Sequence, residues 1–325
     1  MDDIWTNLFS ILASTVRLST PLILAAMGGI LAERSGTVDI GLEAKMLVSA
    51  FVAAAVASVS GSVWIGLLGG IAASVIFALL HGVATIHYKG DHVVSGVALN
   101  FLASGLTVVL GQAWFDMGGQ TPELQGAQRF APVHLPGVDI LREHVPLLGQ
   151  FYATVISGQA VLVYVAFAVV AIVHVLLMHT RLGLRIRAVG EEPNAVDTAG
   201  ISVAALRYLA LIGTGVLCGL AGAYLSTAQN ASFSKDMSAG AGYIALAAVI
   251  FGKWRPLPVL GACLLFGFLQ AMQARLQGVE IPGIGALPTQ VFQALPYILT
   301  VILLAGFIGK AIAPKAIGRP YRKER

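Results

Sequence analysis

Charged side chains are scarce in this 325-residue sequence. Only 11% of the residues are Asp, Glu, Lys or Arg, and 57% are hydrophobic, whereas a soluble domain carries roughly 25% charged residues. Cysteine is limited to Cys218 and Cys263, both inside apolar runs, which excludes a disulfide framework and a cysteine-based metal motif. The sequence also lacks the G-x-x-x-x-G-K-[ST] phosphate loop that ATP-hydrolysing chains use. We therefore expect a protein that is not an enzyme and holds no metal.

The sequence contains several long runs without any charged residue. Most of them exceed the roughly 20 residues that a helix needs to cross a hydrocarbon core of about 30 Å. The strict alternation of polar and apolar residues that is typical of transmembrane β-barrels is missing. We predict an all-α polytopic membrane protein, a single transmembrane domain over residues 1–325 with about eight to ten transmembrane helices. The runs cover residues 46–80, 93–115, 145–173, 208–234, 237–252, 256–274 and 281–309.

Small residues follow a helix-packing pattern within these runs. The chain has 37 glycines, and the pairs Gly66/Gly70 and Gly215/Gly219 have the small-xxx-small spacing. Because small residues let two helix backbones approach closely in lipid, the two pairs predict sites of tight helix–helix contact.

Basic segments predict the orientation of the chain. Residues 310–325 contain six Lys or Arg and one Glu, and the positive-inside rule places such a tail in the cytoplasm. Counting back through spans 281–309, 256–274, 237–252 and 208–226 places the polar segment 180–207 in the cytoplasm as well. Span 154–179 precedes that segment, so the proline-containing loop 115–152 is expected outside.

The N-terminal part leaves two alternatives for the number of spans. Residues 62–86 and 37–60 read as a helical hairpin, and 93–113 as the next span. If residues 4–32 also cross the membrane, the protein has nine spanning helices and an external N-terminus. Alternatively, residues 33–43 form a bend inside the bundle, and the count changes.

The segment 181–207 is a polar island in the apolar chain, with seven of its charged residues. Pro193 suits the first turn of a helix, where its missing N–H is not needed. Acidic residues around it favour a helix start, and Gly200 suits a helix end. We predict a short helix over 193–199 that is presented to a soluble partner; the alternative is an ordinary loop with surface charges.

Three segments of this sequence resemble motifs of one transporter family. The string RLGLRIRAVGEEPNAVDTAGI resembles the cytoplasmic coupling segment of ABC importer permeases in the ribose/branched-chain amino acid permease superfamily. LAERSGTVDIGLEAKMLVSAFVA and FGKWRPLPVLGACLLFGFLQA resemble the early and later motifs of its nucleoside and simple-sugar branch. The three segments lie between residues 31 and 271.

The resemblance implies a permease subunit of an ATP-driven importer for nucleosides in a bacterial inner membrane. Its implied partners are a second homologous permease, a separate ATP-binding protein that holds ATP and Mg²⁺, an external substrate-binding protein and membrane lipid, and no nucleic acid. Simple sugars or other small polar solutes remain alternatives, as does an ion-coupled secondary transporter. The residues implied to contact the ATP-binding protein are Gly190, Glu191, Glu192, Pro193, Asn194, Ala195, Asp197 and Gly200.

Polar residues inside the spans are candidates for the translocation path. Asp39 and Glu43 are four apart and would share one face of a helix, with Arg17 as a candidate partner of either carboxylate. They brace the path if they lie deep, or mark the membrane interface if they do not. Amide side chains bind sugar hydroxyls and base edges, or alternatively bond neighbouring helices. The path candidates are Ser35, Thr37, Asp39, Glu43, Asn100, Gln229, Asn230 and Gln270.

Two segments of the chain also echo each other. SGTVDIGLEAKMLVSAFVAA and SKDMSAGAGYIALAAVIFG each place Ser and Asp before a glycine-containing apolar helix. Paired interrupted helices of this kind are typical of transporters that are built from inverted repeats.

Overall fold

The fold is almost entirely helical. The computed structural model describes residues 2–138, 145–276 and 312–323, with a few isolated positions between 280 and 302. The only sheets in this described part are two short antiparallel pairs, β1 (Pro132–Val133) with β2 (Gln159–Ala160) and β3 (Glu280–Ile281) with β4 (Gly285–Ala286). The α-helices are α1 (Asp2–Arg34), α2 (Leu42–Ser60), α3 (Val63–Gly82), α4 (His92–Phe115), α6 (Pro146–Phe151), α7 (Val161–His179), α8 (Arg181–Glu191), α9 (Pro193–Thr198), α10 (Val203–Tyr224), α11 (Ala241–Phe251) and α12 (Pro256–Leu276).

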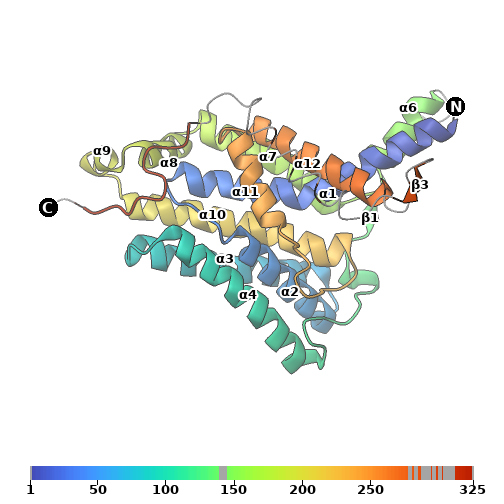
Figure 1. The fold of residues 1–325 in the computed structure, drawn as a ribbon, viewed down its shortest axis with the longest axis horizontal. Coiled ribbons are helices and arrows are strands. Elements are labelled where there is room, and N and C mark those ends of the chain that lie inside the picture. The colour runs from blue at the N-terminus through green and yellow to red at the C-terminus, as the bar shows by residue number, and fades with distance from the viewer. Residues whose placement is uncertain are drawn as a thin grey trace.

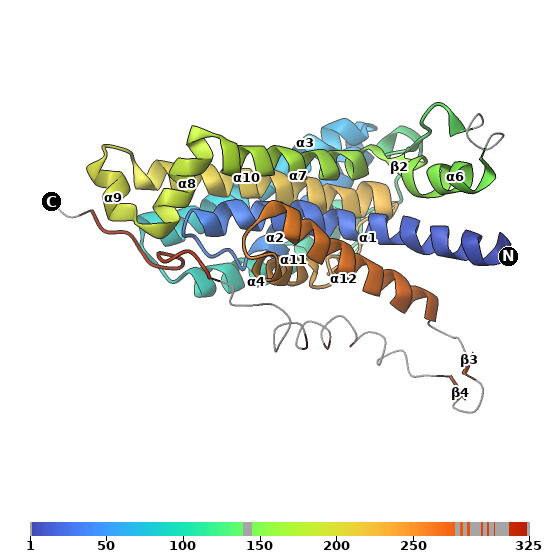
Figure 2. The ribbon, with the colours of Figure 1, turned by 90° about the horizontal axis from the view of Figure 1, so that it is seen from above.

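The helices form an elongated bundle with two distinct ends (Figure 1). One end carries α8, α9 and the C-terminus, and we call it the basic end, defined by residues 181–207 and 312–323. The opposite end carries the N-terminus, α6 and the β1–β2 pair. Figure 2 shows α1, α7 and α10 running side by side between the two ends. The two basic segments therefore lie on the same side of the bundle, as the positive-inside count predicts.

Seven helices of the described part are long and apolar enough to cross a membrane. They confirm an all-α polytopic membrane protein, and the predicted span 281–309 lies outside the described residues. Helix α1 is one continuous helix, and a bend at residues 35–41 follows it. The long N-terminal helix and the bend after it, which the sequence left as alternatives, are therefore both present. The seven candidate spans are Trp5–Arg34, Leu42–Ser60, Val63–His87, His92–Phe115, Val161–His179, Val203–Gln229 and Pro256–Arg275.

Close approaches between helices occur at both predicted glycine pairs. A Cβ on Gly66 would lie 2.6 Å from the carbonyl oxygen of Ala53 in α2, and one on Gly219 would lie 2.7 Å from the Cα of Ile71 in α3. Only glycine permits backbones this close. Helix α2 is the most buried of the spans, so it forms the centre of the bundle between α3, α4 and α10.

The predicted span 237–252 is wrong in its length. Helix α11 has 11 residues, or roughly 16 Å, which is about half of the hydrocarbon core. The preceding segment 230–240 is not helical, and Asp236, Ala239 and Gly240 have positive φ angles of 52°, 46° and 81°. Turn-forming Ser, Asp and Gly residues in this stretch favour such a conformation. The chain thus returns into the bundle as the non-helical segment 230–240, which we call the re-entrant loop, and continues toward the basic end as the half-length helix α11.

The loop before α7 is longer than the sequence indicates. The predicted span 154–179 is a membrane-crossing helix only from Val161, because residues 152–156 form a separate π-helical turn after α6 and residues 159–160 form strand β2. The part of loop 115–152 that the structure describes lies at the end that also holds the N-terminus (Figure 1).

Candidate functional site: coupling segment and translocation path

The polar island folds as two short helices. Thr180 starts α8 by accepting a hydrogen bond from the backbone N–H of Gly183 at 3.1 Å, as N-cap residues do. Glu192 separates α8 from α9, which begins at Pro193 and ends at Thr198, one residue before the predicted end. Gly200 follows with a left-handed φ of 77°. The predicted short helix is therefore present at the predicted place.

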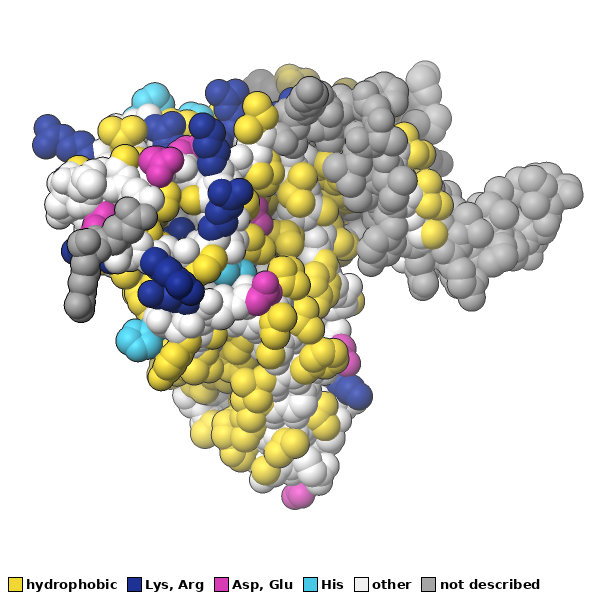
Figure 3. Space-filling view, turned by 60° about the vertical axis from the view of Figure 1, so that its left-hand side comes forward, with side chains coloured by type: hydrophobic (Ala, Val, Ile, Leu, Met, Phe, Trp, Pro, Cys, Tyr) yellow, Lys and Arg dark blue, Asp and Glu magenta, His cyan; other side chains and the backbone are white. Residues whose placement is uncertain are grey.

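Most of the implied coupling residues are exposed. Glu191, Glu192, Asn194, Ala195 and Gly200 face outward, whereas Pro193 and Asp197 are half-buried. Lys and Arg side chains gather on the part of the molecule that carries this segment (Figure 3).

Gly190 lies inside the fold instead. A Cβ at this position would collide with the carbonyl oxygen of Arg34 in α1. The structure therefore places Gly190 in the packing between α8 and α1, and the surface that is open to a partner begins at Glu191.

The C-terminal tail runs across the basic end as a strap, which we define as residues 312–323. The backbone N–H of Ala316 donates to the carbonyl of Gly190 at 2.8 Å, and that of Gly318 donates to the carbonyl of Gly36 at 2.9 Å. The guanidinium of Arg207 in α10 donates to the carbonyl of Arg319 at 3.2 Å. The strap therefore joins the coupling segment to the bend 35–41, a contact that the charge count of the tail did not reveal.

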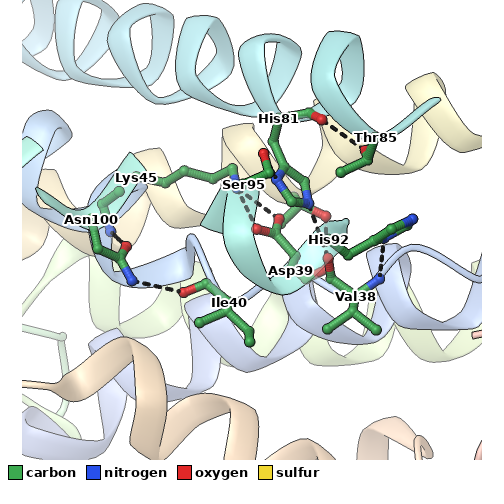
Figure 4. Close-up of polar contacts among 12 residues, drawn as sticks. Val38, Asp39, Ile40, Lys45, His81, Thr85, His92, Ser95 and Asn100 are labelled. Carbon is green, nitrogen blue, oxygen red and sulfur yellow. Dashed lines mark hydrogen bonds and ion pairs between the residues drawn. The ribbon is translucent and has the colours of Figure 1, made fainter. Parts of the chain in front are cut away.

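Asp39 forms a buried ion pair with Lys45. The ammonium lies 2.6 and 2.7 Å from the two carboxylate oxygens, and both side chains are 0% exposed (Figure 4). The predicted partner Arg17 is wrong, because its guanidinium donates to Gln159 at 3.0 Å. The predicted shared helix face with Glu43 is also wrong, because Asp39 lies in the bend and α2 begins only at Leu42.

The residues around Asp39 hold the bend against α3 and α4. His81 contacts the carbonyl of Val38 at 2.9 Å and the hydroxyl of Ser95 at 3.0 Å. His92 accepts a hydrogen bond from the N–H of Val38 at 3.1 Å. Burial raises the pKa of Asp39, but the charges of Lys45 and His81 outweigh it and hold that pKa below its usual value. Asp39 therefore stays ionised in its buried pair.

Ser35, Thr37 and Asp39 are enclosed within the bundle. All three are 0% exposed, and none of them lines either of the two cavities described below. The described part of the chain contains no cluster of three or more His, Cys, Asp or Glu that could hold a metal ion.

Glu43 ties α2 to the re-entrant loop. One carboxylate oxygen accepts from the Ser238 hydroxyl at 2.6 Å and the Gly240 N–H at 2.9 Å, and the other accepts from the Gly242 N–H at 2.7 Å. A carboxylate at the start of α11 satisfies free N–H groups and the positive end of the helix dipole. The two segments that echo each other in sequence therefore contact each other through Glu43.

Asn100 bonds neighbouring elements, as the alternative for the amide side chains stated. Its oxygen accepts from the N–H of Ala44 at 2.9 Å in the first turn of α2. Its nitrogen donates to the carbonyl of Ile40 at 3.2 Å and to the hydroxyl of Tyr243 at 2.7 Å. Asn100 thus fixes the start of α2 relative to α4 and α11.

A cavity of about 550 Å³ lies between α1, α12, the end of α10 and the re-entrant loop. Gln229 and Gln270 line it, together with Gln273. Gln273 was not among the predicted path residues, although it follows Gln270 by three residues on one helix face. Asn230 is not among the lining residues, and its amide donates to the carbonyl of Leu225 at 3.1 Å.

A second cavity of about 620 Å³ opens near the N-terminal end of the bundle. Arg17, Arg129 and Gln159 line it, and Gln229 borders both this cavity and the first one. The side chain of Gln229 therefore lies between the two cavities.

A multi-pass helical bundle with cavities lined by amide side chains and an exposed short helix at one end is the architecture expected of a membrane transport protein. Residues 11–304 match the family model described as the branched-chain amino acid transport system / permease component. The chain belongs to this family and is a permease subunit of an ABC transporter.

Its similarity to curated relatives extends over nearly the whole chain. The nucleoside ABC transporter permease protein NupC of Lactococcus lactis subsp. cremoris (strain MG1363) is 38% identical over 97% of both chains. The guanosine ABC transporter permease protein NupQ of Bacillus subtilis (strain 168) is 38% identical over 99% of both chains. The putative glucose ABC transporter permease protein TsgC13 of Haloferax volcanii is 34% identical over 97% of this chain and 98% of the relative.

A second permease of each of the first two organisms is also similar. Nucleoside permease NupB of L. lactis is 29% identical over 47% of this chain and 40% of its own length, and guanosine permease NupP of B. subtilis is 23% identical over 99% and 88%. No solved structure matches the chain.

Proposed function

We propose that this chain is the permease subunit of an ATP-driven nucleoside importer in a bacterial inner membrane, with its C-terminus in the cytoplasm. The end-to-end similarity to two nucleoside permeases carries the proposal. ATP and Mg²⁺ are bound by a separate ATP-binding protein, and an external binding protein delivers the solute. The chain supplies the route and carries out no chemical step.

The cavity at Gln229 suits a neutral polar solute. Its volume of about 550 Å³ lies in the range of roughly 300–1,000 Å³ that is usual for small-molecule sites. The described lining residues include three glutamines and Ser238 but no charged side chain. Amide groups both donate and accept hydrogen bonds, so they match the base edges and ribose hydroxyls of a nucleoside.

The partner across the membrane is a second, related permease of a different sequence. Two organisms each have two nucleoside permeases among the relatives, and this chain is more similar to NupC and NupQ than to NupB and NupP. It therefore takes the place of NupC or NupQ in a heterodimer.

The conformational change driven by ATP hydrolysis in the ATP-binding protein reaches this chain through α9. The exposed residues Glu191, Glu192, Asn194, Ala195 and Gly200, with the half-buried Pro193 and Asp197, dock on the ATP-binding protein. A movement of α9 passes to α8 and α10, which flank it, and through the strap to the bend 35–41.

Uptake into proteoliposomes that contain the whole importer tests the proposal. Uptake of labelled guanosine or uridine that depends on ATP, and that excess glucose or ribose does not reduce, supports it. Preferential competition by the sugars would favour the sugar alternative, to which TsgC13 points. Uptake driven by an ion gradient with an inactive ATP-binding protein would assign the chain to the secondary transporters.

A further inference from the structure

The surface between α4 and the re-entrant loop carries polar groups that no role above explains. The hydroxyl of Ser104 in α4 donates to the carboxylate of Asp236 at 2.8 Å. One turn away on α4, Asn100 bonds to Tyr243. Asp236 and its neighbour Lys235 are exposed, and Tyr243 is 46% exposed.

This polar surface lies at the middle of the membrane-spanning region. Helix α4 has 24 residues, and Ser104 is the thirteenth of them. Twelve residues of the helix precede Ser104 and eleven follow it, which is roughly 16–18 Å of helix on either side. Because Asp236 is bonded to Ser104, its carboxylate lies at the same depth.

Lipid is an unsuitable neighbour for this surface on two independent grounds. A charged side chain at the centre of a bilayer is costly, so it persists beside water or a protein partner. The residues that present it, 230–240, are non-helical, and non-helical backbone at membrane depth is tolerated only where protein buries it or where it lines a water-filled cavity. Water at this surface would solvate the charged side chain and the non-helical backbone alike.

The same loop also borders the cavity of about 550 Å³. Met237, Ser238 and Ala239 line this cavity directly after Asp236. The loop therefore contributes to both the cavity and the Asp236 surface, and Glu43 holds it in place.

We propose that Asp236, Ser104 and Tyr243 form a solute-binding surface halfway along a water-filled translocation path. A carboxylate only accepts hydrogen bonds, so this side chain favours solutes that carry hydroxyl or N–H donors and disfavours anions. If the solute is a nucleoside, as the proposed function on which this assignment rests states, its ribose hydroxyls are the groups that donate to Asp236. Asp236 is then a specificity-determining residue that contacts the solute.

Cysteine labelling of the assembled importer tests the water-filled path without reference to the solute. The native Cys218 and Cys263 are buried, so the background is low. Tyr243→Cys is compared with Leu102→Cys, whose side chain points roughly 160° away from Ser104 on α4. A membrane-impermeant thiol reagent is expected to label Tyr243→Cys at least about tenfold faster, because only a hydrated thiol ionises to the reactive thiolate. Equal rates would overturn the proposal.

Uptake kinetics test the donor selectivity. Asp236→Asn is expected to raise the KM for guanosine several-fold and to leave the KM for dideoxyguanosine, which lacks the ribose hydroxyl donors at two positions, nearly unchanged. A KM for guanosine that stays at the wild-type value would refute the role of Asp236. If no nucleoside is transported but the labelling contrast persists, the proposed substrate fails and the water-filled path stands.

Discussion

The backbone N–H of Ala316 donates a hydrogen bond to the carbonyl of Gly190 at 2.8 Å, although the two residues belong to the C-terminal tail and to the coupling segment. Two residues later, Gly318 donates to Gly36 in the bend between α1 and α2. The strap therefore bonds at one end to α8, next to the segment proposed to dock on an ATP-binding protein, and at the other to the bend that holds Asp39.

Removal of the strap tests whether it transmits movement. Truncation before Pro314 removes the hydrogen bonds of Ala316 and Gly318, worth about 0.5–1.5 kcal/mol each. We expect faster amide exchange in α8 and α9 and fewer solute molecules transported per ATP hydrolysed. Mass-spectrometric hydrogen exchange and paired uptake and ATPase assays measure the two effects.

A single charge in the strap provides the control for that truncation. Lys323 lies 3.7 Å from Asp197, and its side chain is 72% exposed. Exposed pairs of this kind contribute little to stability, so Lys323→Ala should leave exchange and transport as in the wild type. If Lys323→Ala alone reproduces the truncation, charge rather than the backbone contacts of the strap matters.

Substitutions at Gly190 and at Glu192 are expected to impair transport in different ways. Gly190→Val places a side chain against the backbone of Arg34, and such overpacking costs about 1–3 kcal/mol. This variant should lose both thermal stability and uptake. Glu192→Trp changes an exposed position, so its melting temperature should stay at the wild-type value while the ATP-binding protein no longer co-purifies. Full co-purification with Glu192→Trp would remove α9 from the docking surface.

The spans, the short helix α9 and the glycine contacts were predictable because each depends on local sequence. A run of apolar residues, a proline at a helix start and paired glycines act within one or two turns. The place of α9 after Glu192 and the tight contacts at Gly66 and Gly219 follow from such signals.

The pairing of Asp39 and the length of α11 depend on tertiary contacts instead. Lys45 is six residues from Asp39, which is not a helical spacing, and only the bend before Leu42 brings the two together. It is nevertheless the only Lys or Arg between Arg34 and Lys89, a signal that could have identified it. Helix α11 starts at Ala241 because Glu43 binds the N–H groups there, and no pattern within 237–252 reports that contact.

Neutralising Asp39 should destabilise the protein through Lys45. In Asp39→Asn the ammonium stays buried without a counter-charge, and breaking a buried pair in this way costs about 3–5 kcal/mol. We expect a lower melting temperature in detergent and less uptake. Replacing both partners, as Asp39→Asn with Lys45→Met, removes both charges and should recover much of the melting temperature. An Asp39→Asn variant with the melting temperature of the wild type would show that the ion pair is not required for the fold.

Glu43 offers a graded test of how the loop is held. Glu43→Gln keeps one acceptor oxygen for the contacts with Ser238 and Gly240 but loses the charge, whereas Glu43→Ala leaves the N–H groups of Gly240 and Gly242 without a partner. Hydrogen bonds to a charged group contribute about 1.5–3 kcal/mol each. We therefore expect uptake to fall in the order wild type, Glu43→Gln, Glu43→Ala, with a rising KM, because the loop that lines the cavity is released. Wild-type KM values in both variants would show that the loop is held by other contacts.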